Sequence, residues 1–259
     1  MHVTDITSFE LPPLHESLTW LTPLSEERAA HLVNFLTDPE PAEVLDMGCG
    51  WSELLLRALA SAPSARGCGV DKASAFIDRA KEQAQARGLA DRVTFEVMPG
   101  MEAQAHPADA VICIGASHIW GPPVEDAQPL DYAAALRALR ALVLPGGRLV
   151  YGEAIWTAAP HPAAIAPLSG RDDEFLTQDA LLKQIRAAGF DVVDEDQATL
   201  EEWDVFEAGF RGRFTRWLEA NEAGHPAAEQ VRQQYEEQRA AYEDGYRGVL
   251  GMGYFCLRG

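Results

Sequence analysis

The sequence predicts an α/β protein built on one mostly parallel sheet. Apolar runs of strand length alternate with longer segments whose apolar residues recur every three or four positions, a pattern typical of repeated β-α units. After about residue 200 the alternation breaks, because two helical patterns follow one another between residues 203 and 245 before a last strand. We expect these two helices to form a small cap over one end of the sheet.

Each predicted element has a local signal. Strand-like apolar runs occupy residues 43–47, 66–71, 92–97, 108–115, 146–153, 190–198 and 251–259. Ser25 is placed to cap a helix that extends to about Leu36, and Gly88 is a C-cap for the helix that begins near Ala73. The remaining helical patterns cover residues 52–61, 131–143 and 177–189.

The composition describes an ordinary globular chain with a strong acidic excess. Hydrophobic residues make up 47% of the 259 residues, and 21 basic against 40 acidic residues give a net charge of −19. Such a surface repels nucleic acid and anionic lipid, so neither is expected as a partner. No apolar run is long enough to span a bilayer and no signal peptide opens the chain, which predicts a soluble cytoplasmic protein.

The four cysteines predict neither a disulfide framework nor a zinc framework. Cys49, Cys68, Cys113 and Cys256 are far apart and form no CxxC pair. Most of them fall in or beside apolar runs, so we expect reduced thiols, three of which fill the core.

A glycine turn, Gly48-Cys49-Gly50, follows the first strand. A dinucleotide fingerprint needs a third glycine, but Glu53 stands there and places an acid where a pyrophosphate would sit. A phosphate-binding P-loop is excluded because the Gly-Lys-Ser/Thr ending is missing. Asp71 ends the next strand, about 20 residues later, where an acid can accept hydrogen bonds from ribose hydroxyls. The turn therefore predicts a site for a nucleoside without phosphate.

Four segments together resemble the class I S-adenosylmethionine-dependent methyltransferases. They are VLDMGCG at 44–50, the acid Asp71, ADAVICIGASH at 108–118 and LPGGRLVYGE at 144–153. The resemblance implies a Rossmann-like three-layer sandwich whose seven-stranded, mostly parallel sheet has an antiparallel last strand. The segments CIGASHIWG, GEAIW, DEFLT, WDVFE and GMGYF are similar to a bacterial branch that methylates small molecules.

The resemblance also implies S-adenosylmethionine as the cofactor. It places Asp46 near the methionine end, the glycine turn beneath the cofactor and Asp71 on the ribose hydroxyls. Where many relatives have Gly-Asp-Ala after the third strand, this chain has Met98-Pro99-Gly100-Met101-Glu102, so adenine contacts are expected from backbone and from Met98 or Met101. The predicted cofactor-binding residues are Asp46, Gly48, Cys49, Gly50, Trp51, Asp71, Lys72, Pro99, Gly100, Met101, Gly115 and Ser117.

Two residues are candidates for catalysis at the carboxyl ends of strands, where ligands of open α/β sheets bind. His118 follows the fourth strand and is either a general base or a hydrogen-bonded residue of the pocket wall. Glu153 ends the fifth strand and is either a buried acid that accepts loop hydrogen bonds or a group that orients the substrate. Methyl transfer is an in-line displacement that depends mainly on alignment, so a base is needed only for a protonated nucleophile.

Aromatic residues suggest the walls of an acceptor pocket. The predicted pocket residues are His15, Trp20, Trp120, Trp156 and Tyr254, with Phe9, His15 and Trp20 closing it as an N-terminal lid. For Trp120, Trp156 and Tyr254 ordinary core or rim packing is the alternative. The stripe Phe206, Phe210, Phe214 and Trp217 is expected first to pack the cap on the domain. No residue spacing predicts a metal site.

These expectations describe a single methyltransferase domain over residues 1–259. It comprises an N-terminal lid and helix at 1–40, a cofactor-binding core at 43–200, a helical cap at 203–245 and a closing strand at 250–258. A monomer or homodimer that acts on a small molecule is expected.

Other functions remain open from the sequence. One is a cofactor-binding module without methyl transfer. A second is an aminopropyl transferase, which would require a carboxylate cluster after the fourth strand. A third is a nicotinamide oxidoreductase, which would require the third glycine.

Overall fold

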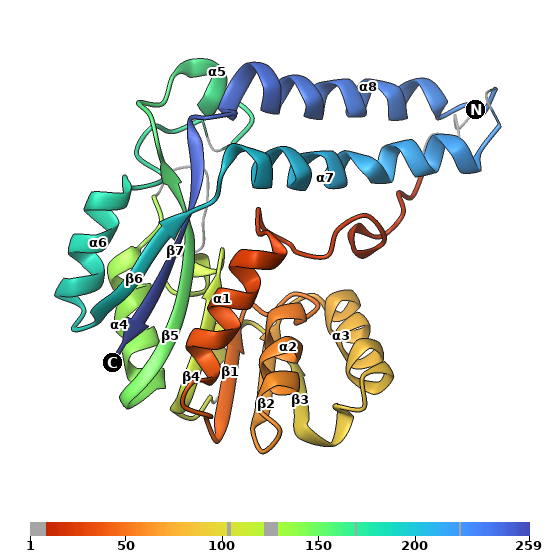
Figure 1. The fold of residues 1–259 in the computed structure, drawn as a ribbon. Helices are drawn as coiled ribbons and strands as arrows, with labels where there is room; N and C mark the ends of the chain where they lie inside the picture. The colour runs from red at the N-terminus through yellow and green to blue at the C-terminus, as the bar shows by residue number, and fades with distance from the viewer. Residues whose placement is uncertain (1–8, 103–104, 122–128, 169, 223) are drawn as a thin grey trace.

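A computed structural model describes residues 9–102, 105–121, 129–168, 170–222 and 224–259, with only the backbone of Met101, and it contains one seven-stranded sheet (Figure 1). The order across the sheet is β3-β2-β1-β4-β5-β7-β6. The five strands β3, β2, β1, β4 and β5 are parallel to one another, and β7 is antiparallel to both of its neighbours, β5 and β6. The strands are β1 (Glu43–Met47), β2 (Arg66–Asp71), β3 (Val93–Val97), β4 (Ala108–Ile114), β5 (Val143–Trp156), β6 (Asp191–Gln197) and β7 (Leu250–Arg258). The predicted fold class is confirmed.

Helices cover both faces of this sheet. One face packs against α1 (Glu26–Thr37), α2 (Glu53–Ser61) and α3 (Ser74–Ala86). The opposite face packs against α4 (Tyr132–Leu142) and α6 (Gln178–Ala187). Three further helices lie toward the carboxyl ends of the parallel strands, namely α5 (Pro162–Ile165), α7 (Leu200–Ala220) and α8 (Ala228–Ala240), the last continuing into a π-helical turn at Ala241–Tyr246.

Two elements extend clearly beyond their predicted bounds, for identifiable reasons. β5 extends beyond the predicted 146–153 at both ends. At its start Val143 pairs with Ala108 of β4, and at its end the pairing with β7 continues to Trp156. α7 begins three residues before the predicted start at 203. Thr199 and Glu202 form a capping box there, each side chain bonding the other residue's backbone N–H, which satisfies two free donors of the first turn.

The chain also brings its N-terminal segment, defined here as residues 9–24, under the cap. α7 and α8 lie side by side above the end of the sheet where the parallel strands finish, and the N-terminal segment runs between α7 and that end (Figure 1). Gly209 of α7 makes room for it, since a Cβ there would lie 2.3 Å from Leu18 Cδ2 and 3.0 Å from the Ser17 carbonyl oxygen. Phe9 packs on Trp217, with ring centroids 5.5 Å apart.

Two further expectations can be compared with the described residues. None of their helices is both long enough and apolar enough to cross a membrane. The four cysteines are free, as expected, with Cys113 and Cys256 buried and Cys49 and Cys68 partly buried.

Candidate active site

The glycine turn after β1 is fixed against the end of β2. The N–H groups of Gly48 and Cys49 both donate to the Val70 carbonyl, at 2.9 and 3.0 Å. Gly48 has φ +73°, and a Cβ there would lie 2.5 Å from the Cβ of Ala116. Glycine is therefore required both by the backbone conformation and by the closeness of the β4 end.

Asp71, at the end of β2, is held by two backbone donors. Its Oδ2 accepts from the N–H of Gly50 at 2.9 Å, and its Oδ1 accepts from the N–H of Ala73 at 2.8 Å. The Asp71 carbonyl accepts from the N–H of Met98 at 3.0 Å. These bonds connect the loops after β1, β2 and β3 at the same edge of the sheet.

Asp46 is buried beside the turn, with 4% of its surface exposed. Burial, and secondarily the nearby charge of Asp71, raises the pKa of Asp46 to about 8. An isolated carboxylate is costly to bury, so this group retains a proton at neutral pH until a cation or hydrogen-bond donor reaches it.

The position of the missing third glycine is occupied by a paired acid. Glu53 is buried and accepts from Arg57 Nε at 2.7 Å and Arg87 at 2.5 Å. Glu53 is the acid expected in the first helical turn, but its charge is compensated by Arg57 and Arg87. The case against a dinucleotide turn therefore depends on the absent glycine rather than on charge repulsion.

The N-terminal segment covers the turn directly. Trp51 Nε1 donates to the Thr19 carbonyl at 2.8 Å, and the Trp51 ring meets the edge of His15 at 6.2 Å between centroids. A Cβ on Gly50 would lie 2.8 Å from Leu21 Cδ1. Between the segment and the turn is an 80 Å³ cavity bordered by both, including Asp46, Gly48, Gly50, Trp20 and Thr22.

Ser117 and Glu153 interact at the ends of β4 and β5. The Ser117 N–H donates to Glu153 Oε2 at 3.2 Å, and its hydroxyl lies 2.7 Å from the Tyr151 hydroxyl. Glu153 Oε1 accepts from the N–H of Ala154 at 3.0 Å, and burial raises the pKa of this carboxyl. Glu153 therefore holds the turn that carries the next residue, His118.

His118 lies on the outer side of that turn. Its side chain reaches the surface and is partly covered by neighbouring groups, whereas Ser117 is fully buried. Partial burial, followed by the charge of Lys72, lowers the pKa of His118, which favours the neutral imidazole that a general base requires. Gly115, two residues before Ser117, has φ +65° and open space where a Cβ would be.

The loop after β3 reaches the same turn. Gly100 packs against Ile119, because a Cβ at Gly100 would lie 2.6 Å from Ile119 Cγ2. Pro99 is exposed and Met98 is partly buried. The Met101 side chain lies outside the described residues. The predicted adenine-contacting loop thus borders the turn that carries His118.

The predicted acceptor-pocket residues do not line one cavity among the described residues. Trp20 and Tyr254 line a cavity of 690 Å³ between α1, β6, β7 and α7, and Trp20 also borders the smaller cavity at the glycine turn. Trp156 is buried, packs on Phe175 and donates from Nε1 to the Asp172 carbonyl at 2.8 Å. Trp120 packs on the α4 side of the sheet, and His15 contacts the glycine turn as described above.

The 690 Å³ cavity contains residues that the sequence analysis did not single out. Arg28 of α1 donates to Glu202 from Nε and Nη2, both at 3.0 Å, and pairs with Asp196. Burial opposes ionisation of Glu202, but the hydrogen bond from Arg28 and others outweigh it and lower its pKa to about 2. In the sequence, Glu202 is marked by the Thr-x-x-Glu capping pattern at 199–202. No sequence pattern marks its partner, Arg28.

Comparisons with known proteins identify a family model and a relative that spans most of this chain. Residues 45–149 match the family model described as a methyltransferase domain. The uncharacterized protein YjhP of Escherichia coli (strain K12) is 32% identical over 238 residues, which cover 91% of this chain and 92% of YjhP.

Two solved structures are similar over nearly their whole length. One is a SAM-dependent methyltransferase from Geobacter sulfurreducens in complex with S-adenosyl-L-homocysteine, with a TM-score of 0.80 and 30% identity, covering 94% of this chain and 95% of that one. The other, from Thiobacillus denitrificans and also in complex with S-adenosyl-L-homocysteine, has a TM-score of 0.78, 30% identity and the same coverage of both chains.

Proposed function

The chain belongs to the S-adenosylmethionine-dependent methyltransferases, and we propose that it transfers the methyl group of S-adenosylmethionine to a small-molecule acceptor. The observation that carries this proposal lies at the carboxyl ends of β1 and β2, where Asp71 is hydrogen-bonded to the glycine turn and Asp46 is buried beside that turn. This edge presents an oriented carboxylate for a ribose and a second acid for a positively charged group. Both fit a sulfonium nucleoside.

The chain's own residues bind and orient the cofactor in this proposal. Asp71 accepts from the ribose hydroxyls, Asp46 faces the cationic methionine end, and the backbone of the Gly48–Gly50 turn passes beneath. The loop at 99–101 borders the adenine. When bound, the cofactor supplies an electrophilic methyl group on its sulfonium.

The acceptor site is proposed beyond the ends of β4 and β5. Gly115 leaves open space there, and His118 is exposed with a lowered pKa. His118 takes the proton of the acceptor when its nucleophile arrives protonated. Glu153 is a positioning residue, because it holds the backbone of Ser117 and does not itself reach the open side.

A small acceptor is supported by how this edge is covered. The N-terminal segment lies over the glycine turn, and α7 packs over that segment. The net charge of −19 opposes a polyanionic substrate such as nucleic acid. Four free cysteines fit a reducing compartment, and a cytoplasmic monomer or homodimer is proposed on that basis.

Methyl transfer is tested with S-adenosylmethionine labelled in its methyl group. Purified protein is incubated with this cofactor and a fractionated metabolite extract, and labelled products are identified by mass. We expect a product heavier than its acceptor by one labelled methyl group.

Each alternative gives a different result in this experiment or in parallel ones with the decarboxylated cofactor and with NAD. Cofactor binding without any labelled product would favour a binding module. Transfer only from the decarboxylated cofactor, with a gain of an aminopropyl group, would favour an aminopropyl transferase. Tight binding of NAD with none of S-adenosylmethionine would overturn the proposal.

A further inference from the structure

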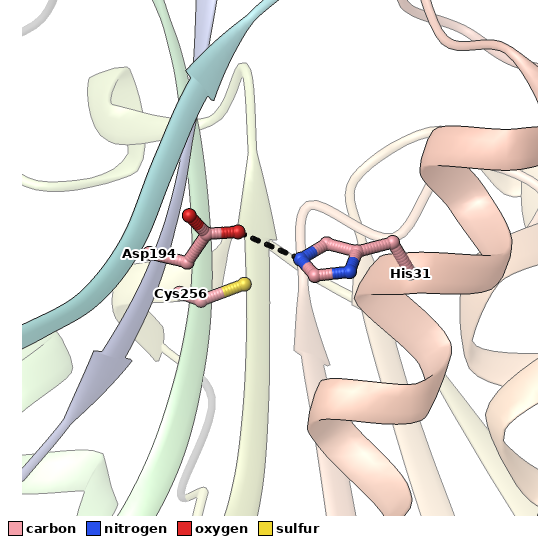
Figure 2. A group of neighbouring side chains, drawn as sticks. All are labelled: His31, Asp194 and Cys256. Carbon is pink, nitrogen blue, oxygen red and sulfur yellow. Dashed lines mark hydrogen bonds and ion pairs between the residues drawn. The ribbon is translucent and has the colours of Figure 1, made fainter.

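His31, Asp194 and Cys256 come together on one wall of the 690 Å³ cavity (Figure 2). His31 Nε2 lies 2.8 Å from Asp194 Oδ2, and one ligand atom from each of the three residues lies within 4.8 Å of the others. They belong to three different elements, α1, β6 and β7, and Figure 2 shows their side chains pointing toward one another.

A bulge in β6 creates this juxtaposition. Asp191 and Val192 pair with Arg258 and Leu257, but the next pair joins Asp194, not Val193, to Cys256. Bulges insert one unpaired residue and re-aim the side chains beyond it. Without the bulge Val193 would lie opposite Cys256, and the carboxylate of Asp194 would turn to the other face.

From this geometry we propose that His31, Asp194 and Cys256 form a binding site for one Zn²⁺ ion. Imidazole, carboxylate and thiolate are the three side-chain ligands that zinc takes in proteins. Zinc–ligand bonds of about 2.0 to 2.3 Å place tetrahedral ligand atoms about 3.3 to 3.7 Å apart, so closing the site needs only small side-chain rotations.

The surrounding charge favours a divalent cation. Glu27, Glu201 and Asp196 line the same cavity. The basic group Arg28 is already paired with Glu202 and Asp196, so it leaves much of the acidic charge uncompensated.

Three protein ligands leave a fourth zinc position open. All three residues line the cavity, so the open position faces a space large enough for water or a small molecule. Three ligands with an accessible fourth position distinguish zinc sites that bind exogenous groups from closed structural sites. Zinc bound here also joins α1 to the strand pair β6–β7.

Zinc binding is measured on tag-free protein by titration against a chromophoric chelator, and Co²⁺ is used as a spectroscopic probe. We expect one equivalent of zinc and a thiolate-to-cobalt absorption band. Loss of a residue that only hydrogen-bonds to a metal ligand lowers metal affinity by about 10- to 100-fold. Loss of a ligand itself should therefore weaken zinc binding by about a hundredfold or more. The variants are Asp194→Asn, His31→Gln and Cys256→Ser.

Two control variants separate ligation from general attraction. Glu201→Gln removes a nearby acid that is not a ligand, so it should weaken zinc binding far less than the loss of a ligand does. Cys68→Ser removes a thiol on β2 and should leave zinc binding unchanged. Circular dichroism checks folding, and Asp194→Asn is the decisive variant because Asp194 is 51% exposed and its change leaves the core intact.

The proposal fails if the unchanged protein binds zinc no more tightly than the Asp194→Asn variant, or if the cobalt complex lacks the thiolate band. S-adenosylmethionine affinity and labelled methyl transfer, measured on the same samples, test the proposed function separately, because none of the three zinc ligands borders the cavity at the glycine turn.

Discussion

The backbone N–H of Gly50 donates to Asp71 Oδ2 at 2.9 Å, so the turn after β1 and the acid that ends β2 form one hydrogen-bonded unit. The second carboxylate oxygen is held by Ala73 at 2.8 Å. Each oxygen of an ionised carboxylate has a further lone-pair direction. Asp71 is thus oriented in advance, and a ribose binds without first reordering this side chain.

Replacing this acid should nearly abolish cofactor binding. Asp71→Ala removes two hydrogen bonds to a charged group, which together are worth about 3 kcal/mol or more, or roughly a hundredfold in affinity. Isothermal titration with S-adenosylmethionine measures the change. Asp78→Ala, which removes an exposed acid from α3, is the control; equal affinity of the Asp71 and Asp78 variants would remove the basis of the proposed ribose contact.

The affinity for S-adenosylmethionine should increase with pH up to about 8. Since the pKa of Asp46 is raised to about 8, the unliganded protein holds a proton there that the cationic methionine end displaces. Below that pKa the affinity should fall by up to about tenfold per pH unit, and above it the affinity should level off. Titration in buffers of different ionisation enthalpy should detect one proton released.

The same carboxyl group affects folding in the opposite direction. Its pKa is raised in the folded state, so the folded chain binds more protons than the unfolded chain between about pH 4 and 8, and the free energy of unfolding falls as pH rises through that interval. Asp46→Asn should flatten both dependences. A pH-dependent affinity that persists in Asp46→Asn would assign the titration to another group.

His118 should affect turnover more than binding. A general base contributes about 10² to 10⁴ in rate, so His118→Ala should lower kcat by that range while S-adenosylmethionine affinity changes little. Lys72→Met removes a cation that lowers the pKa of His118. The pKa of His118 should then rise, and the acid limb of the pH–rate profile should move to higher pH. Equal losses of turnover and affinity in His118→Ala would make the residue structural.

The packing of the N-terminal segment on α7 should influence cofactor retention. Gly209→Val adds a side chain where a Cβ would already lie 2.3 Å from Leu18, so it should displace the segment that covers the turn and speed cofactor dissociation. Ala208→Val is the control, because it places the same valine side chain at an exposed neighbouring position. Stopped-flow release measures both, and identical rates would contradict a lid.

Glu153 should act through Ser117. Glu153→Gln places an amide donor against one of two backbone N–H groups, so the free energy of unfolding should fall by about 1 to 2 kcal/mol, and kcat should fall with it. Urea unfolding and steady-state kinetics measure the two effects. A raised KM for the acceptor with unchanged stability would instead show that Glu153 contacts the substrate.

Much of this site was predictable because its signals are local. Gly48 and Gly50 lie next to a strand, and Asp71 ends the following one, so the order of the elements alone brings them to one edge. The aromatic residues were not predictable in the same way. Trp156 is an isolated tryptophan near a strand end, and its burial against Phe175 depends on a segment some twenty residues away.

By itself the sequence determined the strands, the helices and the identity of the turn, since periodicity and glycine positions act over a few residues. Only the tertiary structure decided that Arg57 and Arg87 neutralise Glu53, that the N-terminal segment lies between the turn and α7, and that Val193 bulges out to set Asp194 against Cys256. These relationships depend on strand register and on packing between distant segments, which no local pattern in the chain encodes.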